Sequence, residues 1–264
     1  MNNKAIKQTV VDNLIDLNKY RIIDLTLTVV SADSWIQFPR KLVKGAMEPP
    51  TKIEPISTIK EHGVFVNYIE TTTQSFTHYD APIHFDENGL ANDEVPLEQL
   101  MGEAVVIDMM HKRPGEGVTA TDLEASGIEV KPGDIAIIRT GWTDRAWGTR
   151  EFWEKMIYLT EDACDWLIKK RIKALAQDFM TDLAPLHRCE VCGQLTPVRK
   201  DIPGQPEPER SHIKFLKENG ILLIEWLTNL GKIKKPRVFF ICLPMKLKGT
   251  DGAPARVIAL EEKT

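Results

Sequence analysis

Hydrophobic residues in the first half of the chain gather in short runs that turn residues separate. The runs at 21–30 and 103–110 are rich in Val and Ile, and the run at 130–142 opens with a Pro-Gly-Asp turn. Short apolar runs bounded by turn residues are typical of buried strands. Residues 51–73 predict a pair of strands with a turn at Gly63. We therefore expect mainly β-structure in this half.

Helical patterns appear in the second half, each beside an apolar run. Thr160, Glu161 and Asp162 predict a capped helix start, and residues 208–220 predict a second helix that ends at Gly220. Apolar runs predict further strands at 172–179, 221–227 and 237–245. A helix followed by a strand is typical of α/β packing, so we expect a mostly β core with flanking helices.

Residues 183–210 depart from this pattern because they are rich in proline and polar residues. A loop of this length in a compact domain is usually functional or covers an active site. Cys189 and Cys192 form a Cys-x-x-Cys pair within it, and His187 precedes them. The pair predicts a structural zinc site completed by a neighbouring subunit, a redox-active pair, or unligated thiols. We expect a single domain over residues 1–264 that carries this segment as an insertion.

Charge and composition narrow the class of partner. The net charge is −4 and the pI is about 5.9, which leaves no basic surface for nucleic acid or anionic membranes. No apolar run approaches the roughly 20 residues of a membrane span, and the N-terminus lacks the apolar core of a signal peptide. The four cysteines then indicate reduced thiols. We expect a cytoplasmic protein that acts on a small-molecule substrate and binds neither nucleic acid nor membrane.

Residues 71–89 hold the densest candidate chemistry, because His78, Asp80 and His84 fall within seven positions. A strand would present all three on one face, but six residues of strand cover about 20 Å, too far for one ion to reach. Pro82 favours a turn, so the segment must curl if these groups converge. His78 and Asp80 offer the nitrogen and oxygen ligands that zinc or manganese accepts. His84 is either a further ligand or a proton-transferring imidazole.

Two later residues extend this cluster. Glu225 follows an apolar run, where a carboxylate is costly unless it is paired or bound to a metal. His212 lies on the predicted helix just before that strand. The competing interpretation makes Asp80 a turn-capping residue, His212 a surface residue and Glu225 a strand end that reaches solvent. The two interpretations differ in whether these side chains gather round one ion.

Several segments resemble one known family. Residues 77–85, THYDAPIHF, are similar to the Thr-His-x-Asp-x-Pro-x-His-Phe segment of the cyclase-like metal-dependent hydrolases, which include bacterial kynurenine formamidase and isatin hydrolase. Further similar segments follow the family's order: IIDLT, VKPGDIAIIRTGW, SHIKFLKENGILLIEWLTNL and LPMKLKGTDGAPARVIA. The resemblance covers roughly residues 20–260. It implies the family's swivelling β/β/α fold, of the α/β (α+β) class, and assembly as a homodimer or homotetramer.

The resemblance also implies roles for the candidate residues. The implied metal ligands are His78, Asp80, His212 and Glu225. Asp80 is able to bridge two ions, and His84 matches the proton-transferring histidine of the family. Gln74 stands where the family has a further ligand histidine, and its amide oxygen is a weaker, harder ligand than imidazole. That exchange favours manganese over zinc, or one ion over two.

Aromatic residues near the expected site bear on the substrate. Phe76 replaces a family glycine, which removes space beside the metal, so we expect a substrate pocket unlike that of kynurenine formamidase. Trp35 and Phe38 are the candidates for the substrate-contacting aromatic that precedes a proline in the family. Asp178 and Asp182 fall where the family has an aspartate-containing turn near the site.

The chemistry that the resemblance implies is hydrolysis of a non-peptide C–N bond, in a linear or cyclic amide, by metal-activated water. One or two Mn²⁺ or Zn²⁺ ions would serve as the cofactor. His84 would take up a proton and pass it to the departing nitrogen. Two alternatives stay open. One is a metal-dependent lyase or dehydratase in which His84 abstracts a proton. The other is a catalytically weakened small-molecule-binding homologue, because Gln74 replaces a ligand.

Overall fold

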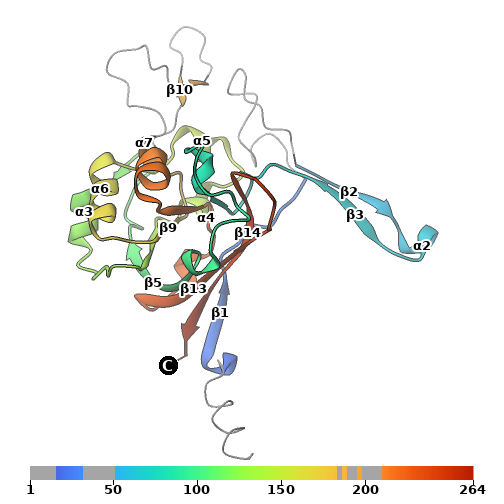
Figure 1. Ribbon diagram of the computed structural model, residues 1–264, viewed down its shortest axis with the longest axis horizontal. Coiled ribbons are helices and arrows are strands. Elements are labelled where there is room, and N and C mark those ends of the chain that lie inside the picture. The colour runs from blue at the N-terminus through green and yellow to red at the C-terminus, as the bar shows by residue number, and fades with distance from the viewer. Residues whose placement is uncertain (1–15, 32–50, 183–185, 189–194, 198–209, 264) are drawn as a thin grey trace, which may run out of the picture.

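The structure is a computed structural model that describes residues 16–31, 51–182, 186–188, 195–197 and 210–263. Its centre is an eight-stranded sheet with the order β1-β14-β13-β5-β7-β9-β12-β4. Figure 1 labels β1, β5, β9, β13 and β14 of this sheet. Strand β4 also pairs with β14, so the sheet closes into a barrel-like ring. The strands of this sheet are β1 (Tyr20–Asp24), β4 (His78–Asp80), β5 (Met101–Asp108), β7 (Ile135–Arg139), β9 (Ala174–Gln177), β12 (Leu222–Glu225), β13 (Arg237–Pro244) and β14 (Gly252–Glu262).

Three small two-stranded sheets accompany the ring. They are β2 (Lys52–Ser57) with β3 (Val66–Glu70), β6 (Gly117–Val118) with β8 (Tyr158–Leu159), and β10 (Leu186–Arg188) with β11 (Leu195–Pro197). The α-helices are α2 (Ile59–His62), α3 (Ala120–Ala125), α4 (Trp142–Ala146), α5 (Arg150–Glu154), α6 (Glu161–Lys169) and α7 (Arg210–His212). A π-helix, η4 (Ile213–Glu218), and four 3₁₀ turns complete the list: η1 (Leu17–Lys19), η2 (Pro82–His84), η3 (Leu97–Gln99) and η5 (Leu230–Lys232).

The ring combines parallel and antiparallel pairs. Strands β5, β7, β9 and β12 are parallel neighbours, and the other pairs are antiparallel. Parallel strands need long crossover connections, and here those connections carry the helices. Figure 1 shows α3, α6 and α7 grouped on one side of the sheet. The fold is therefore of the mixed α/β class with a mostly β core and flanking helices, as the sequence predicts.

Two hydrophobic clusters cover the two faces of the ring strands. Val105 belongs to the cluster that packs against the helices, and its neighbour Val106 belongs to the cluster inside the ring. Side chains alternate in this way along each strand, so strands buried on both faces appear as continuous apolar runs. Small residues such as Ala104, Ala174 and Ala176 occupy the inner face. They leave room for bulkier neighbours within the narrow ring.

The strands predicted at 21–30, 103–110, 130–142, 172–179, 221–227 and 237–245 are confirmed as β1, β5, β7, β9, β12 and β13. Most are shorter than predicted, whereas β5 has the predicted length and begins two residues earlier. The strand pair predicted at 51–73 is confirmed as β2 and β3, although the turn is the short helix α2. Gly63 caps that helix with φ +72°, a left-handed conformation that glycine adopts at no steric cost. Strand β14 escaped prediction because Pro254 and several charged residues interrupt its apolar pattern.

Two helix predictions need correction in detail. Thr160 does stand at the N-cap of α6, but its hydroxyl donates to the carbonyl of Val118 at 2.9 Å instead of capping the helix. The helix predicted over 208–220 begins at Arg210 in the described residues and becomes the π-helix η4 after His212. Gly220 follows its end with φ +62°. The π-helical turn shifts the residues after His212 relative to an ordinary α-helix.

The β2–β3 hairpin and its helix α2 project from the body as an arm (Figure 1). The arm presents several exposed apolar side chains: Ile56, Ile59, Val64, Phe65, Val66, Tyr68 and Ile69. Exposed apolar groups gathered on one projecting element are unusual for a monomer surface. The sequence predicts the strands of this arm but assigns the arm no function.

Some predictions fall on residues outside the described ranges. These are the substrate contacts Trp35 and Phe38 and the thiols Cys189 and Cys192, and the side chain of His187 is likewise not described. The single domain over 1–264 and the insertion at 183–210 stay predictions. None of the helices in the described part of the chain is long and apolar enough to span a membrane.

Candidate metal centre

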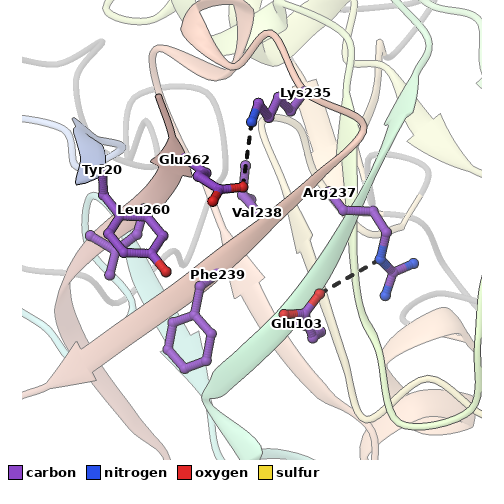
Figure 2. Close-up of a pocket in the computed structure, with 8 residues that line it drawn as sticks. All are labelled: Tyr20, Glu103, Lys235, Arg237, Val238, Phe239, Leu260 and Glu262. Carbon is purple, nitrogen blue, oxygen red and sulfur yellow. Dashed lines mark ion pairs between the residues drawn. The ribbon is translucent and has the colours of Figure 1, made fainter. Parts of the chain in front are cut away.

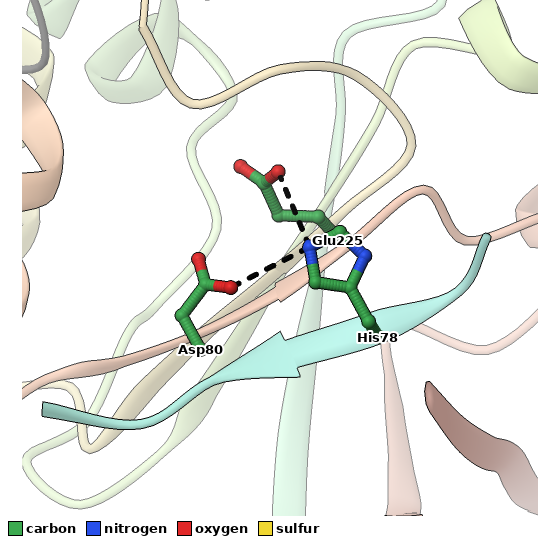
Figure 3. Close-up of side chains that lie close together, drawn as sticks. All are labelled: His78, Asp80 and Glu225. Atoms are coloured by element: carbon green, nitrogen blue, oxygen red, sulfur yellow. Dashed lines mark ion pairs between the residues drawn. The ribbon is translucent and has the colours of Figure 1, made fainter. Parts of the chain in front are cut away.

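Three candidate ligands meet where strands β4 and β12 pair. His78 and Asp80 are two positions apart on β4, so they point to the same face, and the antiparallel register sets Glu225 opposite His78. Nε2 of His78 lies 3.4 Å from Oδ1 of Asp80 and 4.0 Å from Oε2 of Glu225 (Figure 3). The ligand atoms of all three lie within 4.8 Å of one another, and all three residues are buried. This group has the geometry to hold a metal ion.

His212 joins the group from helix α7. Its Nε2 lies 3.7 Å from Oδ2 of Asp80 and 3.8 Å from Oε1 of Glu225. Four of the five side chains proposed as ligands from the sequence, all except Gln74, therefore come together in one place. The alternative interpretation, in which His212 lies on the surface and Glu225 reaches solvent, is wrong because both side chains are buried. Their role as ligands stays a prediction.

Hydrogen bonds orient the two imidazole rings. Nδ1 of His78 lies 2.7 Å from the carbonyl of Phe76, which can only accept, so Nδ1 carries a proton and Nε2 is the nitrogen that faces the carboxylates and is available to a metal ion. Nδ1 of His212 contacts the carboxylate of Asp182, which leaves Nε2 of that ring facing the centre too. Metal-ligating histidines are typically held in this way through their other nitrogen.

Asp80 is the clearest sign that the centre is incomplete without a cation. The residue is 1% exposed, and neither carboxylate oxygen has a hydrogen-bond partner among the described residues. A buried carboxylate without partners is strongly unfavourable. A divalent ion among these nitrogen and oxygen atoms would satisfy both oxygens, so the residues present fit a bound metal.

The electrostatics of the centre agree with this. Burial opposes charge on Asp80, but the neighbouring ring of His78 lowers its pKa below the ordinary value. Burial and the charge of Asp80 together raise the pKa of Glu225. Burial disfavours a charged ring at His212, yet contact with Asp182 outweighs it and raises the pKa to about 9. Two crowded carboxylates thus require positive charge between them, from protonated rings or from a metal ion.

His84 lies beside the centre, where the chain curls after β4. The 3₁₀ turn η2 begins at Pro82, and the backbone N–H of His84 donates to the carbonyl of Ala81. This confirms the curl that Pro82 predicts. The ring of His84 is 6.2 Å from that of His212, and its side chain is 25% exposed. It is more exposed than His78 and Asp80, which are almost fully buried.

Asp251 contacts His84 and was not singled out from the sequence. Its Oδ2 lies 3.1 Å from Nδ1 of His84 and accepts a hydrogen bond of 3.0 Å from the amide of Gln74, while Oδ1 accepts one of 2.7 Å from Thr73. These contacts, His84 first, hold the pKa of Asp251 well below its usual range. The amide nitrogen of Gln74 is therefore engaged with Asp251, and the ligand role of Gln74 stays a prediction.

Phe76 is buried beside the centre and carries backbone strain. Its φ of +57° is left-handed, which costs a residue with a side chain about 1–2 kcal/mol and explains why a glycine suits this position in the family that the sequence resembles. Trp226, directly after Glu225, also has a left-handed φ of +56°. The rings of Trp226 and His78 lie 4.9 Å apart, and Trp147 packs 5.2 Å from Trp226 and 6.2 Å from Phe76. An aromatic wall thus borders His78, although a substrate contact by Phe76 stays a prediction.

The two aspartates noted after β9 have different tasks. Asp178 is buried and accepts hydrogen bonds from Thr140 and Gly141, and burial raises its pKa to about 6. It holds the turn before α4 and touches none of the four candidate ligands. Asp182 instead contacts His212 directly. Sequence spacing alone does not separate these two tasks.

One cavity among the described residues lies away from the centre. It has a volume of about 300 Å³ and contains none of the candidate ligands (Figure 2). Its charged groups are already paired, Arg237 with Asp134 and Glu103, and Lys235 with Glu262. With its charges neutralised in this way, the cavity offers no free charged group to recognise a ligand.

Comparison with known proteins relates the chain to others. A protein-family model described as a putative cyclase matches residues 23–181, more than half of the chain. Cyclase-like protein 3 of Oryza sativa subsp. japonica is 29% identical over 196 residues, which cover 72% of this chain and 63% of that protein. The chain thus spans less than two thirds of the length of this plant relative.

Two bacterial relatives match at similar identity. Isatin hydrolase of Roseibium aggregatum is 25% identical over 261 residues, and the alignment covers 92% of this chain and 92% of that protein. Kynurenine formamidase of Salinibacter ruber is 25% identical over 203 residues, covering 75% of this chain and 81% of that protein. Among solved structures, isatin hydrolase A from Labrenzia aggregata bound to benzyl benzoate superposes with a TM-score of 0.75 at 21% identity, covering 98% of this chain and 100% of that one. The last comparison establishes the similarity of fold.

Proposed function

The chain belongs to the putative cyclase family, and from this premise we propose that it is a metal-dependent hydrolase. The reaction we propose is cleavage of a non-peptide C–N bond in a linear or cyclic amide. Relatives named isatin hydrolase and kynurenine formamidase support an amide-type bond as the target. The observation that carries the proposal is the buried group of His78, Asp80 and Glu225, in which neither oxygen of Asp80 has a hydrogen-bond partner within the described part of the chain.

The proposed ligands are Nε2 of His78, Nε2 of His212 and the carboxylates of Asp80 and Glu225. A set of two nitrogens and two carboxylates suits Zn²⁺ or Mn²⁺. When bound, such an ion lowers the pKa of water and polarises a carbonyl group, which is the chemistry that amide hydrolysis requires. We propose one ion rather than two, because the amide of Gln74 donates to Asp251 where the family offers a further histidine.

His84 is the residue we propose to move the proton. Its Nδ1 faces the carboxylate of Asp251, so Nε2 is the nitrogen left to meet a substrate. Hydrolysis of an amide needs a proton on the departing nitrogen, and imidazole is the side chain that most often serves as such an acid or base. Asp251 holds the ring in one orientation and supports its positive charge during the transfer.

The decisive experiment uses the full chain stripped of metal and reconstituted with Mn²⁺ or Zn²⁺. A panel of amides, cyclic imides and lactones is supplied in ¹⁸O-labelled water, and the masses of the products are measured by mass spectrometry. We expect metal-dependent turnover of an amide or cyclic amide, with one labelled oxygen in the product. Product that carries no label would identify a lyase or dehydratase. Binding of substrates with no turnover under any metal would identify a weakened binding homologue.

We also propose that the chain assembles as a homodimer or homotetramer through the β2–β3 arm. Phe65 is 57% exposed, Ile69 60% and Ile59 71%, although apolar groups of this size normally lie in a protein interior or an interface. The arm forms its own small sheet and projects away from the ring, so its apolar surface is available to a second copy.

The buried free thiols of Cys164 and Cys242 support the expected cytoplasmic location.

Replacing Phe65 and Ile69 with serine is expected to lower the molecular mass measured by light scattering after size exclusion, from oligomer to monomer at micromolar concentration. Both side chains are exposed in one chain, so the change should leave the fold of that chain intact. A matched double variant, Lys60→Ala with Glu61→Ala, alters exposed polar residues on the same arm and should keep the wild-type mass. A wild-type protein that is already monomeric would refute this assembly.

A further inference from the structure

The loop directly after β9 touches two of the four candidate ligands through adjacent residues. We propose that Thr181 and Asp182 are positioning residues, which hold Glu225 and His212 in the orientation that binds a metal ion. The inference rests on the proposed function, because it assumes that Glu225 and His212 are ligands. Neither Thr181 nor Asp182 needs to touch the ion or the substrate to act in this way.

Thr181 orients Glu225 from one side. Its backbone N–H lies 3.1 Å from Oε1 of Glu225, and its hydroxyl contacts the same oxygen. The amide nitrogen of Gln177 lies 2.5 Å from that hydroxyl and 3.2 Å from the same carboxylate oxygen. Because the amide nitrogen of Gln177 can only donate, the Thr181 hydroxyl accepts from it and donates its own hydrogen bond to Glu225. Oε1 therefore accepts three hydrogen bonds, and Oε2 is left to face His78.

Asp182 orients His212 through both of its oxygens. Oδ2 contacts Nδ1 of the ring, and Oδ1 accepts a hydrogen bond of 2.7 Å from the backbone N–H of Ser211. A carboxylate at Nδ1 keeps a proton there, so Nε2 is the nitrogen that would give up its proton and bind a metal ion, and it also makes the ring a stronger ligand. The second bond holds the backbone that carries the ring. Asp182 thus sets both the position and the tautomer of His212.

Packing places the backbone near His212, because Phe215 and Leu216 of η4 belong to the hydrophobic core, but it does not by itself fix the orientation of the ring. Helix α7 spans only Arg210–His212 before the π-helix begins. Asp182 and Ser211 are 29 positions apart in the sequence, and their hydrogen bond joins the two ends of the 183–210 segment. The charged contact with Asp182 then turns the ring of His212 toward Asp80 and Glu225.

The test measures the affinity of the full chain for Mn²⁺ and Zn²⁺ by titration against a chelator, and the absorption spectrum of bound Co²⁺. We expect Asp182→Asn to weaken binding about 10- to 100-fold, the size of effect that lost support behind a ligand produces. Thr181→Val, which removes the hydroxyl and keeps the size, should weaken binding by about tenfold and alter the Co²⁺ spectrum. Thr181→Ser restores the hydroxyl and should bind within a few fold of wild type.

Asp178→Asn is the matched control. Asp178 is a buried carboxylate near the same loop that touches no candidate ligand, so its folded protein should keep wild-type affinity. Wild-type affinity and an unchanged Co²⁺ spectrum in both Asp182→Asn and Thr181→Val would overturn the inference and leave the metal centre standing. If Asp182→Asn does not fold, equal affinities of Thr181→Val and Thr181→Ser overturn it. A wild-type chain that binds neither ion would overturn the proposed function and this inference together.

Discussion

Replacing His84 with alanine is expected to lower kcat by about 10²- to 10⁴-fold, the usual contribution of a positioned acid or base. The side chain is part-exposed beside the centre and lies against Asp251, yet it is not among the three groups whose ligand atoms lie within 4.8 Å of one another. Its loss should therefore remove proton transfer and spare metal binding. Steady-state kinetics on the amide identified by the labelling experiment measure the first effect, and chelator titration with Mn²⁺ measures the second.

His111→Ala provides the matched control for this variant. The side chain of His111 is 63% exposed, and its nearest charged partner is Asp122, at 3.9 Å. Its removal tests whether losing any histidine is harmful, and we expect wild-type kcat. The proposed role of His84 is wrong if His84→Ala keeps full turnover. It is also wrong if the variant loses metal affinity by the same factor as turnover, because His84 would then act as a ligand.

Replacing Asp80 with asparagine is expected to abolish the stabilisation that a divalent ion confers. Ligand binding at 100 times its Kd adds about 2.7 kcal/mol to the free energy of unfolding. For a protein of this size that corresponds to a rise in Tm of about 5–10 °C. Asparagine lacks the negative charge and the second oxygen that Asp80 offers to the ion, so the rise should vanish. Thermal melts with and without Mn²⁺ measure it, and turnover should fall to the level of the metal-free protein.

Asp178→Asn controls for the loss of a buried carboxylate, because Asp178 and Asp80 are both 1% exposed. The Tm of the control variant should differ from that of wild type, but adding Mn²⁺ should raise it by the same amount as in wild type. An undiminished metal-dependent rise in Asp80→Asn would show that the ion binds somewhere else. That result would remove the main support for the proposed centre.

Local sequence was enough to predict several parts of this protein. His78 and Asp80 share a face because residues two apart on a strand always do, and Pro82 ends that strand because of its own ring geometry. The continuous apolar runs of β7 and β12 predicted buried strands, since such strands are covered on both faces. These features depend on a few neighbouring residues, and the resemblance to the cyclase-like hydrolases added the expected partners of the site.

Only the tertiary structure decided how distant residues meet. Glu225 faces His78 because β12 pairs with β4 in one register, and a register is a property of the whole sheet. Nothing in the local sequence links Asp182 to His212, Thr181 to Glu225 or Asp251 to His84, because each contact crosses a connection whose path depends on the packed ring. The sequence by itself thus determined which groups are available for chemistry. Strand pairing and loop closure decided which of their atoms face one another, because hydrogen bonds between distant segments form only once the chain is folded.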